Sequence, residues 1–449
     1  MPTTNKSIFR WLRHFIWMMA STLASAGAAF LLQIVLARHL PVESYALIVL
    51  AVALANFLQP IGNFGLPWLL AQTSGDRAEI KNWFKASSPV MAFGLSCAIA
   101  ITIGYASFTL AHAPLSRLVL IGLFLPAVFA QPLLEIVTAT CQVRAHFLLV
   151  SVLQAYLQVA RLLAVVILIV LNKVTIGSVL TAYAVVALVG IAISVWVQLA
   201  LTYGHRERGP PSRETIARHT SREVVMGAFP YFLMTLSSIG FAQAAILVMG
   251  KVADRTAVAH FNISYLILSA FFLLPTVIYS KLLLPTLARL AVSDRNRFQA
   301  LITVGLPAMG SIGLLAYAAI LVGGRFALAK LFGASYGQAF PTLAIMALAI
   351  PARFFGSPFA SVMMLRNSMA IKVCYHLVSG TIFIALLLFL APRYGAQGAG
   401  LAFAVSEFVL AFFGYLSVRR GWPEIRRLEG LRPRRLIEAS ELLLGRARI

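Results

Sequence analysis

The sequence predicts an all-α polytopic membrane protein with about twelve membrane-spanning helices. Of its 449 residues, 60% are hydrophobic and only 11% are charged, whereas soluble proteins average about 25% charged residues. Apolar runs of about twenty residues, the length that crosses a bilayer as a helix, recur along the whole chain. The segments between these runs are short, so a large catalytic domain outside the membrane has no room.

Twelve apolar segments are expected to form the spans. The first follows Lys6, Arg10 and Arg13, as the apolar core of a signal peptide would, but it runs unbroken to Ala37, which predicts a retained span. The predicted helices occupy residues 14–38, 44–72, 87–111, 116–140, 146–171, 177–201, 224–250, 256–284, 299–323, 338–362, 370–391 and 396–418.

The basic residues predict the orientation of these helices. With the N-terminus in the cytoplasm, 27 of the 37 Lys and Arg residues lie in loops, tails or span ends on the cytoplasmic side, eight on the opposite side, and two, Arg161 and Arg353, deep within spans. Cytoplasmic loops carry the excess of Lys and Arg in membrane proteins, so both termini are expected in the cytoplasm. The net charge of +23 is interpreted as loop charge, and no nucleic acid is expected as a partner.

A polar segment separates two halves of six spans each. It contains Gly-Pro-Pro and five arginines, and it predicts a first bundle at 1–204, a basic cytoplasmic linker at 205–223 and a second bundle at 224–418. Proline interrupts the second and fourth spans and, correspondingly, the eighth and tenth; matching broken helices in two halves are typical of transporters. These prolines are Pro60, Pro126, Pro132, Pro275, Pro351 and Pro358.

The tail at 419–449 is rich in arginine and has leucines at helical spacing. We predict a basic amphipathic helix that lies on the inner leaflet and binds anionic lipid. The alternative is that its charge only sets the topology.

Sequence motifs for nucleotide hydrolysis, metal binding and hydrolase chemistry are absent. The chain has no GxxxxGK[ST], HExxH, GxSxG or GxGxxG motif. Its three cysteines are far apart and its eight histidines are scattered, which predicts no disulfide framework and no metal site. No cofactor and no enzymatic activity are therefore expected.

Four ionisable residues lie well inside predicted spans: Glu135, Arg161, Arg353 and Glu407. Each costs about 2.5–3.5 kcal/mol at the bilayer centre, so each is expected to face a cavity or a partner. At about 1.5 Å per residue, Arg353 and Glu407 both lie about 15 Å from the inner face, which allows an ion pair. Glu135 lies at about 8 Å and Arg161 at about 22 Å, so Arg161 has no acid at its depth.

Arg161 is the first candidate ligand for an anionic substrate group, because the planar guanidinium suits phosphate. Arg353 is the second, with Glu407 as its partner. The alternatives are that Arg161 snorkels or bonds a helix-end carbonyl and that the Arg353–Glu407 pair is structural. Glu135 and Glu407 are also candidates for coupling transport to protons.

Gln154, Gln158 and Arg161 follow at i, i+4 and i+7 and share one helix face. These glutamines and other polar side chains in broken helices are candidates for hydrogen bonding to sugar hydroxyls; the alternative is bonding between helices. The other candidates are Gln59, Asn63, Gln131, Tyr231 and Gln243.

Several segments resemble the Wzx-type O-antigen flippase and polysaccharide-transporter family. Residues 36–50 resemble its first loop, 142–170 its short basic loop and fifth span, and 250–290 its seventh-to-eighth span unit. Residues 392–407, Pro-Arg-Tyr-Gly-Ala-Gln-Gly-Ala-Gly-Leu-Ala-Phe-Ala-Val-Ser-Glu, resemble its eleventh-to-twelfth span signature and are the most specific match. Three positions depart from the family's usual glycines: Pro41, Ala46 and Ala259.

The resemblance places the chain in the MOP superfamily, with MATE drug exporters and the lipid II flippase. It implies two six-helix bundles around a central cavity, alternating access, and a substrate made of undecaprenyl pyrophosphate bearing an oligosaccharide. It also implies the bacterial inner membrane, with polysaccharide polymerase and chain-length proteins as partners. Its typically basic cavity corresponds to Arg161 and Arg353, and Glu407 matches the acid that closes the last signature.

Three other functions compete with this flippase. A MATE-like cation-coupled antiporter has the same fold, but its cavity would be dominated by acids. An integral-membrane glycosyltransferase or ligase would need larger outer loops with catalytic acids. A non-transporting scaffold of an envelope assembly complex is the third.

Overall fold

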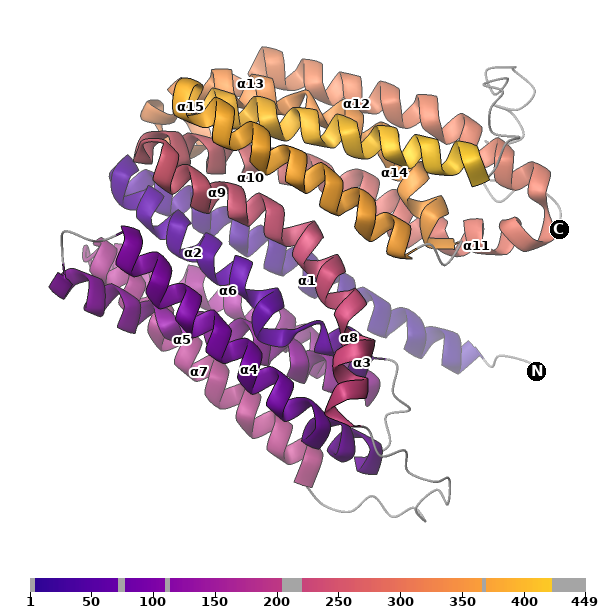
Figure 1. The fold of residues 1–449 in the computed structure, drawn as a ribbon, viewed down its shortest axis with the longest axis horizontal. Coiled ribbons are helices and arrows are strands. Elements are labelled where there is room, and N and C mark those ends of the chain that lie inside the picture. The colour runs from indigo at the N-terminus through magenta and orange to yellow at the C-terminus, as the bar shows by residue number, and fades with distance from the viewer. Residues whose placement is uncertain (1–4, 72–76, 110–113, 204–219, 366–368, 422–449) are drawn as a thin grey trace. The chain divides into compact units, whose positions relative to one another are not determined.

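The computed structural model describes residues 5–71, 77–109, 114–203, 220–365 and 369–421, and all of its regular elements in these ranges are helices (Figure 1). The predicted amphipathic tail falls almost entirely outside the described residues. The chain divides into two compact units, Met1–Leu247 and Val248–Ile449.

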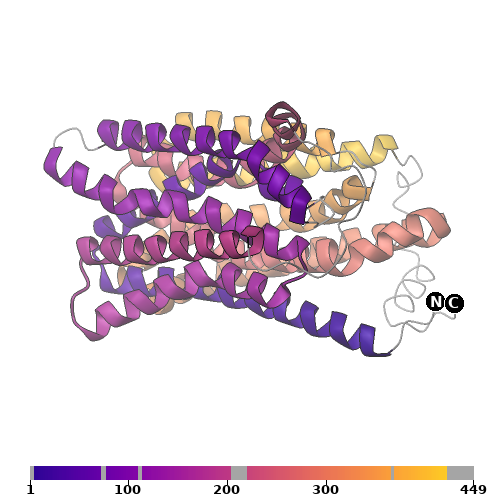
Figure 2. The same cartoon turned by 90° about the horizontal axis from the view of Figure 1, so that it is seen from below.

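Unit 1 contains α1 to α8, the π-helical segment η1 and most of α9. Their bounds are α1 Asn5–His39, α2 Val42–Asn63, α3 Leu66–Leu70, α4 Arg77–Thr109, α5 Pro114–Val143, α6 Phe147–Val170, α7 Ile176–Tyr203, α8 Ser221–Thr235, η1 Leu236–Gly240 and α9 Phe241–Val252. Within this unit α1 packs along α6, and α5 packs along α7 (Figures 1 and 2).

Unit 2 contains the remaining helices. They are α10 Arg255–Pro275, η2 Thr276–Leu283, α11 Leu284–Ser293, α12 Arg295–Phe332, η3 Ala334–Ala339, α13 Phe340–Ala347, α14 Ala349–Leu365 and α15 Met369–Gly421. Here α14 packs against both α12 and α15.

All twelve predicted segments are helical in the described residues, and the predicted fold class is confirmed. Ten helical stretches there are long and apolar enough to cross a membrane. The difference from twelve has two sources. Segment 224–250 is broken into α8, η1 and α9, and the last two spans form one element, α15, with a non-helical kink at Gly395 (φ 55°, ψ −132°).

The second and eighth predicted spans are interrupted near Pro60 and Pro275, but the predicted break of the fourth span is wrong, because Pro126 and Pro132 lie inside the continuous helix α5. Segment 44–72 is two helices, because α2 ends when Phe64 turns into the left-handed region and its N–H donates to the Pro60 carbonyl at 2.8 Å. Gly65 follows with φ 72° and starts α3. In segment 256–284 the α-helix ends at Pro275 and continues as the π-helical η2.

The compact units divide after the start of α8, because α8 packs within unit 1. Val224 and Ala228 of α8 lie in one buried apolar cluster with Leu66 and Trp83. The ring of Phe64 also stacks on that of Phe232 at 4.7 Å. The compact units therefore divide inside α9, and most of the predicted linker lies outside the described residues.

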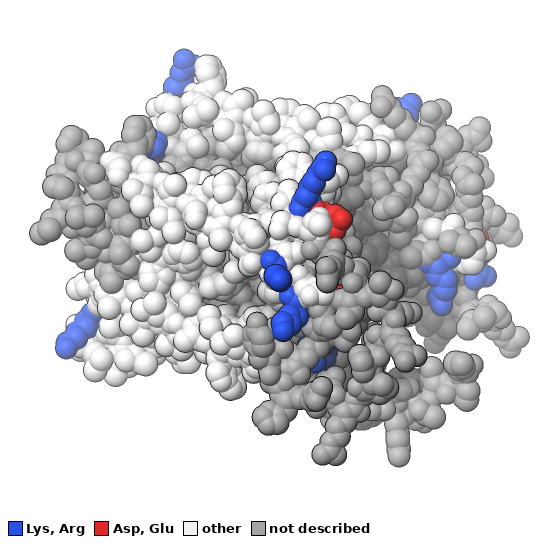
Figure 3. Space-filling view, turned by 60° about the horizontal axis from the view of Figure 1, so that its bottom comes forward, with Lys and Arg blue, Asp and Glu red and all other residues white. Residues whose placement is uncertain are grey.

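The outer surface carries large apolar side chains. Trp196, Phe93 and Val322 are all exposed, and on the face shown in Figure 3 most of the described surface belongs to residues other than Lys, Arg, Asp and Glu. Such a surface suits contact with lipid chains.

Candidate functional site

A polar cavity of about 520 Å³ opens inside unit 1. Side chains from α1, α2, α3, α5, α6, α8 and η1 line it. Six of these side chains are amides, three carry hydroxyl groups and one is a carboxylate: Gln59, Asn63, Gln131, Gln142, Gln154, Gln158, Ser25, Thr138, Thr235 and Glu135. Amides both donate and accept hydrogen bonds, so the cavity suits a polar ligand with many hydroxyl groups.

Glu135 is the acceptor at the centre of a hydrogen-bond network in this cavity. Gln59 Nε2 donates to Oε1 of Glu135, and Asn63 Nδ2 donates to Oε2 at 2.6 Å. Gln131 Nε2 in turn donates to Gln59 Oε1 at 2.6 Å. The Asn63 amide is oriented by the Gly65 N–H, which donates to its Oδ1 at 3.1 Å.

All four of these side chains are candidates from the sequence, but the sequence did not predict that they form hydrogen bonds with one another. The spacing of these residues did indicate shared helix faces, since Gln59 and Asn63 are four residues apart on α2, and Gln131 and Glu135 are four apart on α5. Such spacings place two polar side chains on one face of each helix. What the sequence did not supply is that α2 packs against α5.

The predicted stripe on the fifth span divides in the structure. Gln154 and Gln158 line the unit 1 cavity, but Arg161 does not. Arg161 is only 4% exposed, and its guanidinium carbon lies 4.9 Å from the centre of the Tyr183 ring. Its Nε atom is buried and has no hydrogen-bond partner. A direct role of Arg161 in binding stays a prediction, since its side chain is enclosed between α6 and α7.

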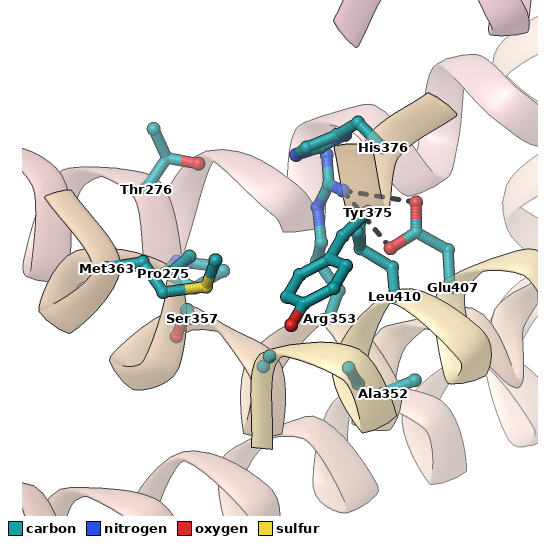
Figure 4. A pocket seen from close by; sticks show the side chains of 14 residues that line it. Pro275, Thr276, Ala352, Arg353, Ser357, Met363, Tyr375, His376, Glu407 and Leu410 are labelled. Carbon is teal, nitrogen blue, oxygen red and sulfur yellow. Dashed lines mark hydrogen bonds and ion pairs between the residues drawn. The ribbon is translucent and has the colours of Figure 1, made fainter. Parts of the chain in front are cut away.

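A smaller cavity of about 210 Å³ lies inside unit 2 and contains the second predicted cation (Figure 4). Arg353 Nη1 lies 3.1 Å from both Oε1 and Oε2 of Glu407, which confirms the ion pair expected from their matched depth. The guanidinium carbon of Arg353 lies 5.0 Å from the centre of the Phe272 ring. The side chain of Arg353 is 39% exposed and that of Glu407 is 10% exposed.

Other polar groups border this ion pair. Tyr375 and His376 of α15 and Ser357 of α14 also line the cavity, and Figure 4 shows Tyr375 and His376 beside the Arg353 side chain. The helix break at Pro275 contributes Thr276. An anion that entered would meet a partly exposed guanidinium with hydroxyl donors nearby. None of these neighbours was a candidate from the sequence; Thr276, Tyr375 and His376 lie far from Arg353 along the chain, whereas Ser357 is four residues away, a spacing that could have indicated it.

Two predicted polar candidates, Tyr231 and Gln243, line neither of these two cavities. In the part of the chain that the structure describes, no cluster of His, Cys, Asp and Glu has a geometry that could hold a metal ion.

Comparison with known protein families decides the membership of the chain. A model of the family described as polysaccharide biosynthesis protein matches residues 11–291, more than half of the sequence. The chain belongs to this family. The expected membership is thereby confirmed, and no curated protein matches the sequence closely enough to add to it.

Solved structures of the MOP superfamily share the fold. The lipid II flippase MurJ in an inward closed conformation has 13% identity and a TM-score of 0.67, over 97% of this chain and 94% of its own. An inward-facing multidrug resistance MATE transporter has 15% identity and a TM-score of 0.54, over 90% and 95%. A MOP superfamily transporter from Pyrococcus furiosus, titled as having a binding pocket of reverse polarity, has 14% identity and a TM-score of 0.53, over 93% and 96%.

Family and fold together make this chain a multi-pass membrane protein of the polysaccharide biosynthesis family, with a fold like those of the MurJ flippase and a MATE transporter.

Proposed function

We propose that the chain is a flippase that moves undecaprenyl-pyrophosphate-linked oligosaccharide repeat units across the bacterial inner membrane by alternating access. The cavity of unit 1 is the main support for this proposal. The chain belongs to the polysaccharide biosynthesis family, and amide and hydroxyl groups line this cavity. Such groups match the dense hydroxyls of an oligosaccharide and have little to offer an apolar drug.

The pyrophosphate would be held by a guanidinium. Arg353 is the better placed of the two predicted cations, since it is partly exposed and lines a cavity. Glu407 neutralises it while the site is empty and gives up one hydrogen bond when an anion arrives. Arg161 could reach a substrate only if α6 and α7 moved apart around it.

Membrane placement and partners complete the proposal. The excess of basic residues favours cytoplasmic termini, and the arginine-rich tail favours anionic lipid of the inner leaflet. A polymerase and a chain-length protein are the partners that the resemblance to the Wzx-type family implies. Glu135 or Glu407 would couple transport to protons.

A cation-coupled antiporter with a MATE-like fold is the second candidate. The carboxylate of Glu135 in an otherwise uncharged lining favours it. Against it, Glu135 is the one carboxylate among the side chains that line the cavity, whereas such an antiporter is expected to have a cavity dominated by acids.

Deletion of the gene distinguishes the flippase from the antiporter. The flippase predicts that a full-length repeat unit linked to undecaprenyl pyrophosphate accumulates on the cytoplasmic leaflet, and that the wild-type gene reverses this. Normal amounts of lipid-linked glycan together with changed drug sensitivity would favour the antiporter instead.

A further inference from the structure

We infer that the unit 1 cavity selects the repeat unit by charge: it accepts uncharged sugars, such as hexoses and N-acetylated amino sugars, and rejects sugars that carry a carboxylate. Glu135 is the selecting group. This inference rests on the proposed function, and it adds the chemical class of the glycan.

An exposed aromatic side chain lies beside the amides of this cavity. Trp68 lines it from α3 and keeps 53% of its surface exposed. The start of α3 packs closely against α8, because Gly65 is left-handed and a Cβ there would lie 2.5 Å from the backbone nitrogen of Phe232. An exposed indole face offers apolar contact to the C–H face of a pyranose, while the surrounding amides reach its hydroxyls.

The hydrogen bonds around Glu135 run in one direction. Gln131 donates to Gln59, and Gln59 and Asn63 both donate to the carboxylate. The Gly65 N–H fixes the amide of Asn63, so its N–H side faces Glu135. A hard metal cation would need oxygens, but these two amides turn nitrogen towards the carboxylate. The network is thus built to supply an acceptor.

Glu135 retains capacity for a ligand. A carboxylate has about four acceptor positions, and two are used by Gln59 and Asn63. A sugar O–H or an acetamido N–H can occupy the others. A uronic acid would instead bring a second negative charge close to Glu135, and like charges brought together in a binding site oppose binding strongly.

Transport of matched lipids by the purified chain in proteoliposomes tests the inference. The probes are three undecaprenyl-pyrophosphate trisaccharides that differ only in the last sugar: glucose, glucuronic acid, and the methyl ester of glucuronic acid. We expect the wild-type chain to move the glucose and ester lipids at similar rates, and the glucuronic acid lipid at least about tenfold more slowly.

Two variants test whether Glu135 is the residue that discriminates between the glucose and glucuronic acid lipids. Glu135→Gln should bring the ratio of glucose to glucuronic acid rates to within about threefold, whereas Glu43→Gln, the same change at an exposed position at the start of α2, should keep the wild-type ratio. The ratio does not depend on the amount of folded protein, and the ester probe removes the charge without altering the protein.

Equal wild-type rates for the glucose and glucuronic acid lipids would overturn the inference and leave the flippase standing. An unchanged ratio in Glu135→Gln would also overturn it. If intact wild-type protein moved none of the three lipids, the proposed function itself would fail, and the inference with it.

Discussion

Removing either partner of the Arg353–Glu407 ion pair should have unequal consequences for stability. At 3.1 Å and an effective dielectric constant of ~20, the attraction between the two charges is about 5 kcal/mol. Much of this is offset by the cost of removing both charges from water. What a single substitution costs therefore depends on how exposed the remaining partner is.

The exposed fractions set the direction of the difference. Arg353→Ala leaves an unpaired carboxylate that is only 10% exposed, which costs about 3 kcal/mol. Glu407→Gln leaves a guanidinium that is 39% exposed and still packs on the Phe272 ring, which costs about 1 kcal/mol. The double variant should be more stable than Arg353→Ala alone, because it contains no unpaired charge.

Thermal unfolding of the purified variants in detergent measures this order, and transport in proteoliposomes measures the role of the guanidinium. Arg353→Ala should have the lowest midpoint and should lose at least about tenfold in transport, whereas Glu407→Gln should keep most of it. Equal midpoints for the two single variants would refute the reasoning from exposure. Equal loss of transport would show that Glu407 is itself required.

Three further predictions concern unit 1. Gly65→Ala should destabilise the protein by about 1–3 kcal/mol, because its Cβ would meet the backbone of α8, while Gly27→Ala, whose Cβ meets nothing within 4 Å, should be neutral or slightly stabilising in thermal unfolding. Asn63→Leu should cost about 1–3 kcal/mol by taking a donor from the buried network, whereas Gln142→Leu, at an exposed position, should cost less than about 0.5 kcal/mol. Arg161→Met should leave the yield of folded protein unchanged, since it removes a buried charge whose Nε has no hydrogen-bond partner. It should lower transport at least about tenfold if Arg161 contacts substrate during the cycle; transport at the wild-type rate would exclude Arg161 from binding.

Helices were the part of the fold most accessible from sequence. Apolar runs of bilayer length identify spans because the bilayer forces every backbone polar group into helical hydrogen bonds. The same rule does not show where a span is interrupted. Pro60 marked a break in the second span, but the left-handed turn at Phe64 and Gly65 that follows it depends on the packing of α8 against α3.

The site was predictable where depth alone decides contact. Arg353 and Glu407 come from spans predicted to run in the same direction, and counting residues from the inner face was enough to pair them. Arg161 shows the limit of that argument. Its spacing from Gln158 put both on one face, but the cavity ends before the next helical turn, where Tyr183 of α7 covers the guanidinium. Where a cavity ends is set by the neighbouring helices, which a single helix pattern does not contain.

Translocation by the purified chain tests the central claim most directly. Proteoliposomes would carry undecaprenyl pyrophosphate bearing a neutral trisaccharide, labelled so that an enzyme added outside modifies only the outer leaflet. We expect the wild-type chain to bring the lipid of the inner leaflet within reach of the added enzyme within minutes, and protein-free vesicles to show no such transfer. The Arg353→Ala variant should be at least about tenfold slower. An inner pool that stays protected in the presence of folded wild-type protein would contradict it.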